Sequence, residues 1–265
     1  MFGSVDFVCL RFHPAKCVNK SDNFGSRQRW TLSVQQPSKP AWTASGVRIR
    51  NEHGPSVEAN GWIDLFAEDN LKLWQGSIGT PRSKQKLTLA EKRRKQAAAD
   101  LAMQTHWKLS DGVLYFDGDD YAVNLETKKN YRNFELALEW RITSQGDSGV
   151  YLRGIPQVQI WDPDTQLASG VGSGGLYNNK THSGTPIIRA DRPVGQWNKM
   201  LIRMLGPLVT VHLNDTCVVD EVVMDNFDSP SMPINGSGPI ALQQHSGPVW
   251  FRDVKIRELA DSVKP

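Results

Sequence analysis

The sequence predicts an all-β protein of the β-sandwich class, and three observations lead to this prediction. The second half of the chain contains many short apolar runs, which Gly, Asn, Asp and Pro turns separate at regular spacing. The clearest run begins at Phe134 and alternates apolar and polar side chains with a period of two. The length of 265 residues suits one large all-β domain, and 39% hydrophobic with 22% charged residues is typical of globular proteins.

The chain divides into two parts of different composition. Residues 1–58 mix Ser, Pro, Asn, Arg and Gln without a sustained period, so we expect a poorly ordered or accessory N-terminal extension. Residues 59–260 are expected to form the β-sandwich domain. Within this domain, Thr88 and Glu91 form a capping-box pattern ahead of an Ala-rich run, which predicts a short helical insertion near 88–105.

After Trp107 the chain consists mostly of strand patterns. Asn214 and Asp215 are expected to form the tight turn of a hairpin. Residues 166–190 are Gly-rich and polar and predict a long loop, which inside a compact domain is usually functional. The expected strands cover residues 113–118, 134–142, 148–154, 157–162, 197–205, 208–213, 216–224, 239–244 and 249–259.

Polar side chains concentrate on three consecutive predicted strands, beginning with the strand from Phe134. A purely structural sheet does not require such a set, so we expect these side chains to form a site. The alternative is an exposed, charged sheet face, in which Glu139 and Arg153 make a cross-strand ion pair that only stabilises the sheet. The side chains concerned are Glu139, Tyr151, Arg153, Gln157, Gln159 and Asp162.

Among the histidines, His245 is the candidate for acid–base chemistry. It follows a predicted strand in the segment LQQHSGPVWFRDV, where side chains project from the rim of a sheet. His212 alternates with apolar neighbours inside a strand, and His106 lies at an element boundary beside a tryptophan. Both are expected to be structural.

Other chemistries lack their motifs. No Walker lysine follows the Gly-rich loop, which excludes a phosphate cradle, and no G-x-S-x-G elbow is present for a serine nucleophile. The three cysteines have no metal-ligand spacing. No run reaches the ~18 apolar residues of a membrane span. The N-terminus lacks the features of a secretory signal, and a net charge of +3 does not indicate nucleic-acid binding.

An ordered set of motifs extends over about residues 61–259 and includes GWIDLF, NFELALEWRI, SGVYLRG, QVQIWD, SGGLYNN and GPIALQQHSGPVWFRDVKIREL. In this ordered set the chain resembles the 3-keto-disaccharide hydrolase family. This resemblance implies a concanavalin A-like jelly-roll sandwich and the hydrolysis of glycosides oxidised at sugar carbon 3, such as 3-keto-trehalose. It also suggests a periplasmic or secreted location.

Two departures from related patterns limit this resemblance. Gln157 stands where members of the family often carry Glu, so a carboxylate is missing there. The E-x-D-x-x-E strand of the related β-glucanases is absent as well. Their retaining mechanism, which needs two carboxylates about 5 Å apart, should therefore not be transferred to this chain.

The implied chemistry assigns a role to each candidate residue. A ketone at carbon 3 acidifies the hydrogen on carbon 2, so a base can form an enolate, the glycosidic oxygen can leave and water can add. Glu139 or His245 is expected to be the base, and Arg153 is expected to stabilise the enolate oxygen. The residues expected to bind substrate are Tyr151, Gln157, Gln159, Asp162 and Gln243.

No cofactor is firmly predicted, although a divalent cation on the enolate is an open possibility. Asp162, Glu139 and His245 could supply ligands, but their spacing matches no recognised metal motif. A second hypothesis is a non-catalytic carbohydrate-binding or lectin-like module, since the same fold serves both functions. A third is an accessory domain that recognises a partner protein. The first two share a carbohydrate as the expected partner.

Overall fold

The computed structural model describes residues 48–49, 57–58 and 60–260 of the chain. All of these residues belong to one compact unit, Lys39–Pro265. Apart from two short strand segments, the extension predicted over residues 1–58 lies outside the described residues. Its division from the domain therefore stays a prediction.

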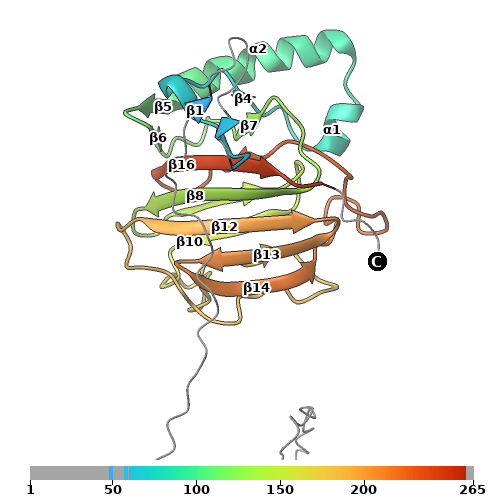
Figure 1. Ribbon diagram of the computed structural model, residues 1–265. Coiled ribbons are helices and arrows are strands. Elements are labelled where there is room, and N and C mark those ends of the chain that lie inside the picture. Colours follow the sequence, from blue (N-terminus) through green and yellow to red (C-terminus); the bar gives the residue numbers. More distant parts are fainter. Residues whose placement is uncertain (1–47, 50–56, 59, 261–265) are drawn as a thin grey trace, which may run out of the picture. The chain divides into compact units, whose positions relative to one another are not determined.

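The larger of two sheets contains ten antiparallel strands, and Figure 1 shows β16, β8, β12, β13 and β14 following one another down this sheet. The strand order is β1-β2-β3-β16-β8-β12-β13-β14, with β6 paired to β16 and β5 paired to β6. The strands are β1 (Arg48–Ile49), β2 (Val57–Glu58), β3 (Ile63–Asp64), β5 (Trp107–Ser110), β6 (Val113–Phe116), β8 (Phe134–Ile142), β12 (Asn198–Leu205), β13 (Leu208–Leu213), β14 (Thr216–Val223) and β16 (Val249–Glu258).

The smaller sheet contains six antiparallel strands in the order β11-β10-β9-β15-β7-β4. The long Gly-rich segment at residues 166–190 contributes one two-residue strand to it and is otherwise a loop, as predicted. The strands are β4 (Trp74–Gly76), β7 (Leu125–Thr127), β9 (Asp147–Tyr151), β10 (Gln157–Trp161), β11 (Leu176–Tyr177) and β15 (Ala241–Leu242).

Apolar side chains from both sheets meet in one core. Strand β8 alternates along its whole length, with Phe134, Trp140 and the other large apolar side chains buried and the side chains between them half-exposed. From the smaller sheet, Val150 and Val158 join the same core. Burial of this apolar surface supplies the main favourable contribution to folding. The predicted all-β jelly-roll sandwich is confirmed.

Two helices lie at one end of the sandwich (Figure 1): α1 (Pro81–Gln85) and α2 (Leu89–His106), preceded in the chain by a 3-10 turn, η1 (Ala67–Asp69). The predicted capping box is present. The Thr88 hydroxyl accepts a hydrogen bond from the Glu91 backbone N–H at 3.3 Å, and the Glu91 carboxylate accepts one from the Thr88 N–H at 2.8 Å. Helix α2 packs against β4 at Gly76, where an added Cβ would overlap the carbonyl oxygen of Ala99.

Strands β8 and β9 follow each other in the chain but lie in different sheets. Strand β8 pairs with β16 and β12, whereas β9 pairs with β10 and β15. The expectation that the polar faces of β8, β9 and β10 form one site is therefore wrong for β8. A period of two identifies the exposed face of a strand, but it does not tell which sheet the strand joins.

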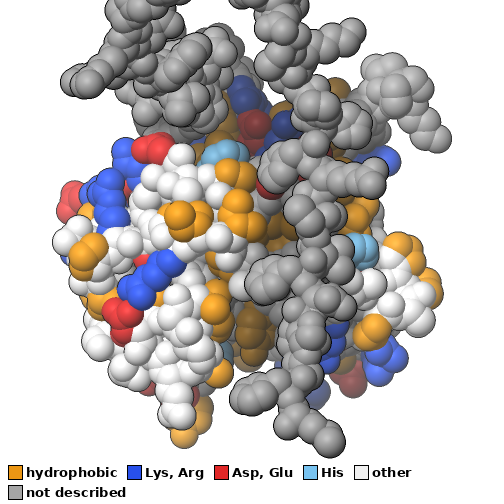
Figure 2. All heavy atoms as spheres, turned by 90° about the horizontal axis from the view of Figure 1, so that it is seen from below, with side chains coloured by type: hydrophobic (Ala, Val, Ile, Leu, Met, Phe, Trp, Pro, Cys, Tyr) orange, Lys and Arg blue, Asp and Glu red, His pale blue; other side chains and the backbone are white. Residues whose placement is uncertain are grey.

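The surface of the described residues carries mixed charge. Figure 2 shows one face on which Lys and Arg side chains lie singly or beside Asp and Glu, without a continuous basic patch. No described helix is both long enough and apolar enough to cross a membrane.

Candidate active site

A row of aligned side chains crosses the outer face of the six-stranded sheet. Residues paired across antiparallel strands point to the same face, and the core-facing positions next to this row are Leu125, Val150 and Val158. The row therefore points away from the core. In strand order it comprises Gln75, Glu126, Ala241, Tyr151, Gln157 and Tyr177.

Four sequence-predicted residues on this face form a chain of hydrogen bonds that ends at Asp147. The Gln243 side-chain amide donates to the Tyr151 hydroxyl at 3.2 Å, and its oxygen accepts from Gln157 at 2.7 Å. Gln157 also donates to the side-chain oxygen of Gln159 at 3.1 Å. Gln159 in turn donates to Oδ1 of Asp147 at 2.6 Å. The structure thus brings Tyr151, Gln157, Gln159 and Gln243 together.

A glycine makes room for this network. Gly149 lies opposite Gln159 in the register between β9 and β10, and an added Cβ would overlap the side-chain amide of Gln157. Without that Cβ, the two glutamines lie flat across the sheet, only 4% and 3% exposed. Buried amides that satisfy one another have fixed orientations, so they can present their remaining donors and acceptors in a defined geometry.

Asp147 and His245 close the network at the rim of the sheet. Nδ1 of His245 lies 3.6 Å from Oδ2 of Asp147, and the His245 side chain is 56% exposed. A pair of backbone hydrogen bonds between Asp147 and Ser246 holds the loop that carries the histidine. The exposed imidazole therefore lies beside a half-buried carboxylate, and this proximity suits an acid–base pair.

Burial perturbs the ionisation of this site. Burial raises the pKa of Asp147, and the neighbouring His245 and the hydrogen bond from Gln159 partly oppose that rise. The pKa of Tyr151 is also raised, first by burial and then by the negative charge of Asp147. The Tyr151 hydroxyl therefore keeps its proton at neutral pH and can serve as a hydrogen-bond donor.

Asp147 is the residue of this site that the sequence prediction missed. It opens β9, and the alternation that identifies Tyr151 reaches Asp147 four residues earlier by way of Gly149. The period-two alternation thus includes Asp147. However, an aspartate that follows a glycine is equally typical of a turn.

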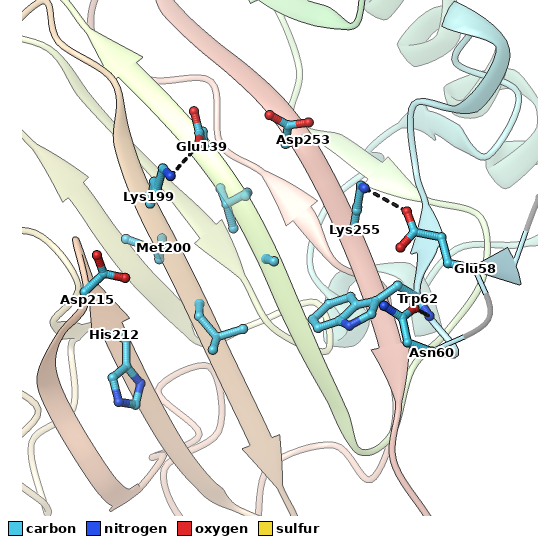
Figure 3. Close-up of a pocket in the computed structure, with 13 residues that line it drawn as sticks. Glu58, Asn60, Trp62, Glu139, Lys199, Met200, His212, Asp215, Asp253 and Lys255 are labelled. Atoms are coloured by element: carbon cyan, nitrogen blue, oxygen red, sulfur yellow. Dashed lines mark hydrogen bonds and ion pairs between the residues drawn. The ribbon is translucent and has the colours of Figure 1, made fainter. Parts of the chain in front are cut away.

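The structure does not bring Glu139 to this face. Glu139 projects from β8 on the outer face of the ten-stranded sheet, so the core separates it from Tyr151. Its carboxylate is 2.7 Å from Nη2 of Arg252 and 3.7 Å from Nζ of Lys199. It lies on a pocket of about 290 Å³ that Trp62 also lines (Figure 3). The predicted cross-strand ion pair thus exists with Arg252 rather than with Arg153.

Arg153 is likewise removed from the glutamine network. Its side chain is 3% exposed and donates to the backbone carbonyls of Arg132 at 2.7 Å and Asn235 at 3.2 Å. Burial, together with the charge of Arg132, lowers the pKa of Arg153 to about 10. Strand β9 ends at Tyr151 and Arg153 adopts a left-handed backbone with φ of 52°. The strand alternation used for the prediction therefore no longer applies at this residue.

Asp162 stabilises the turn after β10. Its carboxylate accepts hydrogen bonds from the backbone N–H groups of Gln145 at 2.9 Å and Asp164 at 3.0 Å. Glu139 lies on the outer face of the other sheet, so the three possible cation ligands Asp162, Glu139 and His245 do not converge. Among the described residues, no three His, Cys, Asp or Glu side chains gather as metal ligands.

Comparisons with known proteins agree with this fold. A 3-keto-disaccharide hydrolase of Bacteroides thetaiotaomicron is 23% identical over 255 residues, which cover 77% of this chain and 80% of that protein. Two crystal structures of Parabacteroides distasonis proteins, each called a "putative glycosyl hydrolase", superpose with TM-scores of 0.53 and 0.55 at 21% and 23% identity. They cover 76% and 75% of this chain and 95% and 99% of their own.

A family match covers most of the sandwich. Residues 61–257 match the family described as the 3-keto-alpha-glucoside-1,2-lyase-like domain. The matched range contains both sheets from β3 onward and every residue of the glutamine network. The chain belongs to this family.

Proposed function

We propose that the protein hydrolyses glycosides oxidised at carbon 3, and that the outer face of the six-stranded sheet is its active site. The observation that carries this proposal is the Asp147–His245 pair, joined through Gln159 to a buried amide network. The family and the hydrolase relative support a glycoside hydrolase-like function. The network adds the groups that the chemistry of a 3-ketone requires.

The proposed reaction proceeds by elimination and addition. A base removes the hydrogen from carbon 2, and the electron pair forms an enolate with the carbonyl at carbon 3. The enolate re-forms the carbonyl and a carbon 1–carbon 2 double bond as the carbon 1–oxygen bond breaks, and the leaving oxygen takes a proton. Water then adds its hydroxyl to carbon 1 and a proton to carbon 2, so that the net change is hydrolysis.

The residues of the face fit these steps. His245 is the proposed base, because its imidazole is exposed and Asp147 can stabilise the positive charge that it gains. The proton-bearing Tyr151 hydroxyl and the second N–H of the Gln243 amide are proposed donors to the oxygen at carbon 3. Gln157 donates both of its amide hydrogens to Gln243 and Gln159 and is proposed to hold these donors in place. Glu139 and Arg153, the earlier candidates for the base and the enolate donor, have no part in this assignment.

A lectin-like function is the second candidate. Most of the network consists of uncharged amides and tyrosines, and Tyr177 at the end of the row is 43% exposed. Such groups bind sugar hydroxyls and stack on sugar rings without any catalysis. On this alternative the Asp147–His245 pair would contribute to binding only.

Incubation with 3-keto-trehalose, unoxidised trehalose and laminarin, each with and without EDTA, tests the proposal. We expect release of 3-keto-glucose and glucose from 3-keto-trehalose alone. Loss of activity in EDTA that added divalent cation restores would show that a metal ion assists. No product from any substrate, together with measurable binding of a glycan, would replace the enzyme by the lectin-like function.

A further inference from the structure

We propose that Lys84 and Glu126 form a second polar subsite on the same face, which binds hydroxyl groups of the sugar unit that leaves. This inference rests on the proposed function and deepens it by assigning a place to the second ring of a disaccharide. Neither residue was singled out from the sequence, because Lys84 lies in a short helix and Glu126 in a three-residue strand.

The register of the sheet puts this pair in line with the proposed catalytic residues. Glu126 and Tyr151 are the partners of Ala241 on its two sides, so they occupy the same row two strands apart. Two strand spacings correspond to about 10 Å. Ala241 between them has the smallest side chain of the row. A two-ring sugar can span this separation, whereas a single ring cannot contact both ends.

The pair lines a hollow, and its carboxylate is buried. Nζ of Lys84 lies 2.7 Å from Oε1 and 2.6 Å from Oε2 of Glu126, and Gln75 donates to Oε1 at 3.1 Å. Glu126 is 3% exposed. The three side chains line a hollow of about 720 Å³, together with residues of the 235–239 loop.

The Lys84 ammonium group keeps hydrogen-bonding capacity beyond its partner. The ammonium group has three donors, and the hydrogen bonds to Glu126 use two of them. The third donor belongs to a side chain that lines the hollow and is 23% exposed.

The walls of the hollow are held in place before any ligand binds. Arg153 ties Arg132 to Asn235, and both of these residues line the hollow. Helix α1, which carries Lys84, is fixed to the 225–240 segment because the Thr80 hydroxyl and the Arg82 side chain both donate to Asp228. Arg153 thus acts as a positioning residue for this subsite.

The chemistry of the pair suits hydroxyl-rich ligands. A carboxylate accepts from hydroxyl groups, an ammonium donates to them and an amide does both. Lys128 and Arg132 also line the hollow, so charge alone does not select an uncharged ligand here. The ligand class expected is a sugar ring, because that is the unit that the proposed reaction releases.

A matched ion pair on the opposite face provides the control. Lys255 and Glu58 point toward each other (Figure 3). The Nζ–Oε1 distance is 2.8 Å, and the two side chains are 22% and 11% exposed. The Lys84–Glu126 side chains are 23% and 4% exposed. The two pairs therefore share their residue types and similar burial, but they lie on different sheets.

The test compares the double variant Lys84→Gln/Glu126→Gln with Lys255→Gln/Glu58→Gln on 3-keto-trehalose and on methyl 3-keto-α-glucoside. Replacing both charges avoids leaving one of them buried without a partner. We expect KM for the two-ring substrate to rise at least about tenfold in the first variant, with the single-ring substrate and the control variant unaffected. Equal losses on both substrates, or a lowered melting temperature with unchanged KM, would overturn the subsite.

Binding of unreacted trehalose separates this inference from the proposed function. If the wild-type protein turns over neither substrate, the proposed function fails, and calorimetry with trehalose then decides the subsite. Binding that weakens about tenfold in the Lys84→Gln/Glu126→Gln variant supports it, whereas unchanged or absent binding overturns it. Gln75→Leu, which keeps both charges paired, repeats the comparison if the double variant does not fold.

Discussion

The two outer faces of the sandwich carry polar side chains of different kinds. On the ten-stranded sheet, Glu139 pairs with Arg252 and Glu135 with Arg257, and the guanidinium group of Arg252 lies 4.1 Å from the ring centre of Trp197. On the six-stranded sheet, amides and hydroxyls bond to one another in a buried network that ends at an exposed histidine.

This difference separates polar groups that only neutralise each other at a surface from polar groups that are held in position. The charges of the ten-stranded face neutralise each other across strands, and such partly exposed pairs contribute little stability. The groups of the six-stranded face have few alternative partners, because burial makes any unsatisfied amide costly. A fixed donor and acceptor pattern is what recognition and catalysis need.

The largest effect is expected from His245→Gln. If the imidazole removes the proton from carbon 2, its loss should lower kcat on 3-keto-trehalose by roughly 10²–10⁴-fold. Steady-state kinetics measures this directly. His212→Gln on the ten-stranded sheet is the matched control and should keep wild-type kcat. Equal losses in the two variants would remove the distinction between the faces.

A smaller effect is expected from Gly149→Ala. The added methyl group overlaps the Gln157 amide, so the network must shift, at a cost of about 1–3 kcal/mol in the free energy of unfolding. We also expect kcat/KM to fall, since the donors that face the substrate move with Gln157. Chemical denaturation and kinetics on the same preparation give both values. Wild-type activity in this variant would show that the network does not position the substrate.

The pH dependence of stability should distinguish Asp147 from Asp147→Asn. Burial raises the folded-state pKa of Asp147 above the unfolded value of about 3.9. Folding therefore favours the protonated form. Relative to the variant, the wild-type protein should be most stable below the unfolded pKa and lose stability as the pH rises through the folded pKa.

Denaturation of both proteins at acid and neutral pH measures this relative stability. The free energy of unfolding of the wild-type protein minus that of Asp147→Asn should be more positive at acid pH. A difference that is constant, or that grows with rising pH, would contradict a raised pKa for this carboxyl group.

The smallest effect is expected from Glu139→Gln. The change removes one partner of Arg252 on the ten-stranded face and should cost at most about 1 kcal/mol of stability. We expect kcat on 3-keto-trehalose to stay at the wild-type value, because the core lies between Glu139 and the six-stranded face. A loss of turnover comparable to that of His245→Gln would return the active site to β8.

The sequence predicted the sandwich, the helix and the amide residues because each depends on local patterns. The alternation in β8 and the capping box at Thr88 are examples, and the structure has both. The division of strands between sheets depends on long-range pairing, so Glu139 was grouped with Tyr151 although β8 and β9 belong to different sheets. Arg153 was misplaced for a local reason, because its strand ends two residues before it.

Solvent hydrogen incorporated at carbon 2 tests the central claim most directly. Wild-type protein is incubated with 3-keto-trehalose in D₂O, and mass spectrometry then measures deuterium in the released 3-keto-glucose, with product alone in D₂O as the blank. Proton abstraction followed by water addition predicts one deuterium at carbon 2 beyond the blank, and His245→Gln should lose this incorporation together with turnover. Product that retains its original hydrogen at carbon 2, or undiminished incorporation by His245→Gln, would contradict the account.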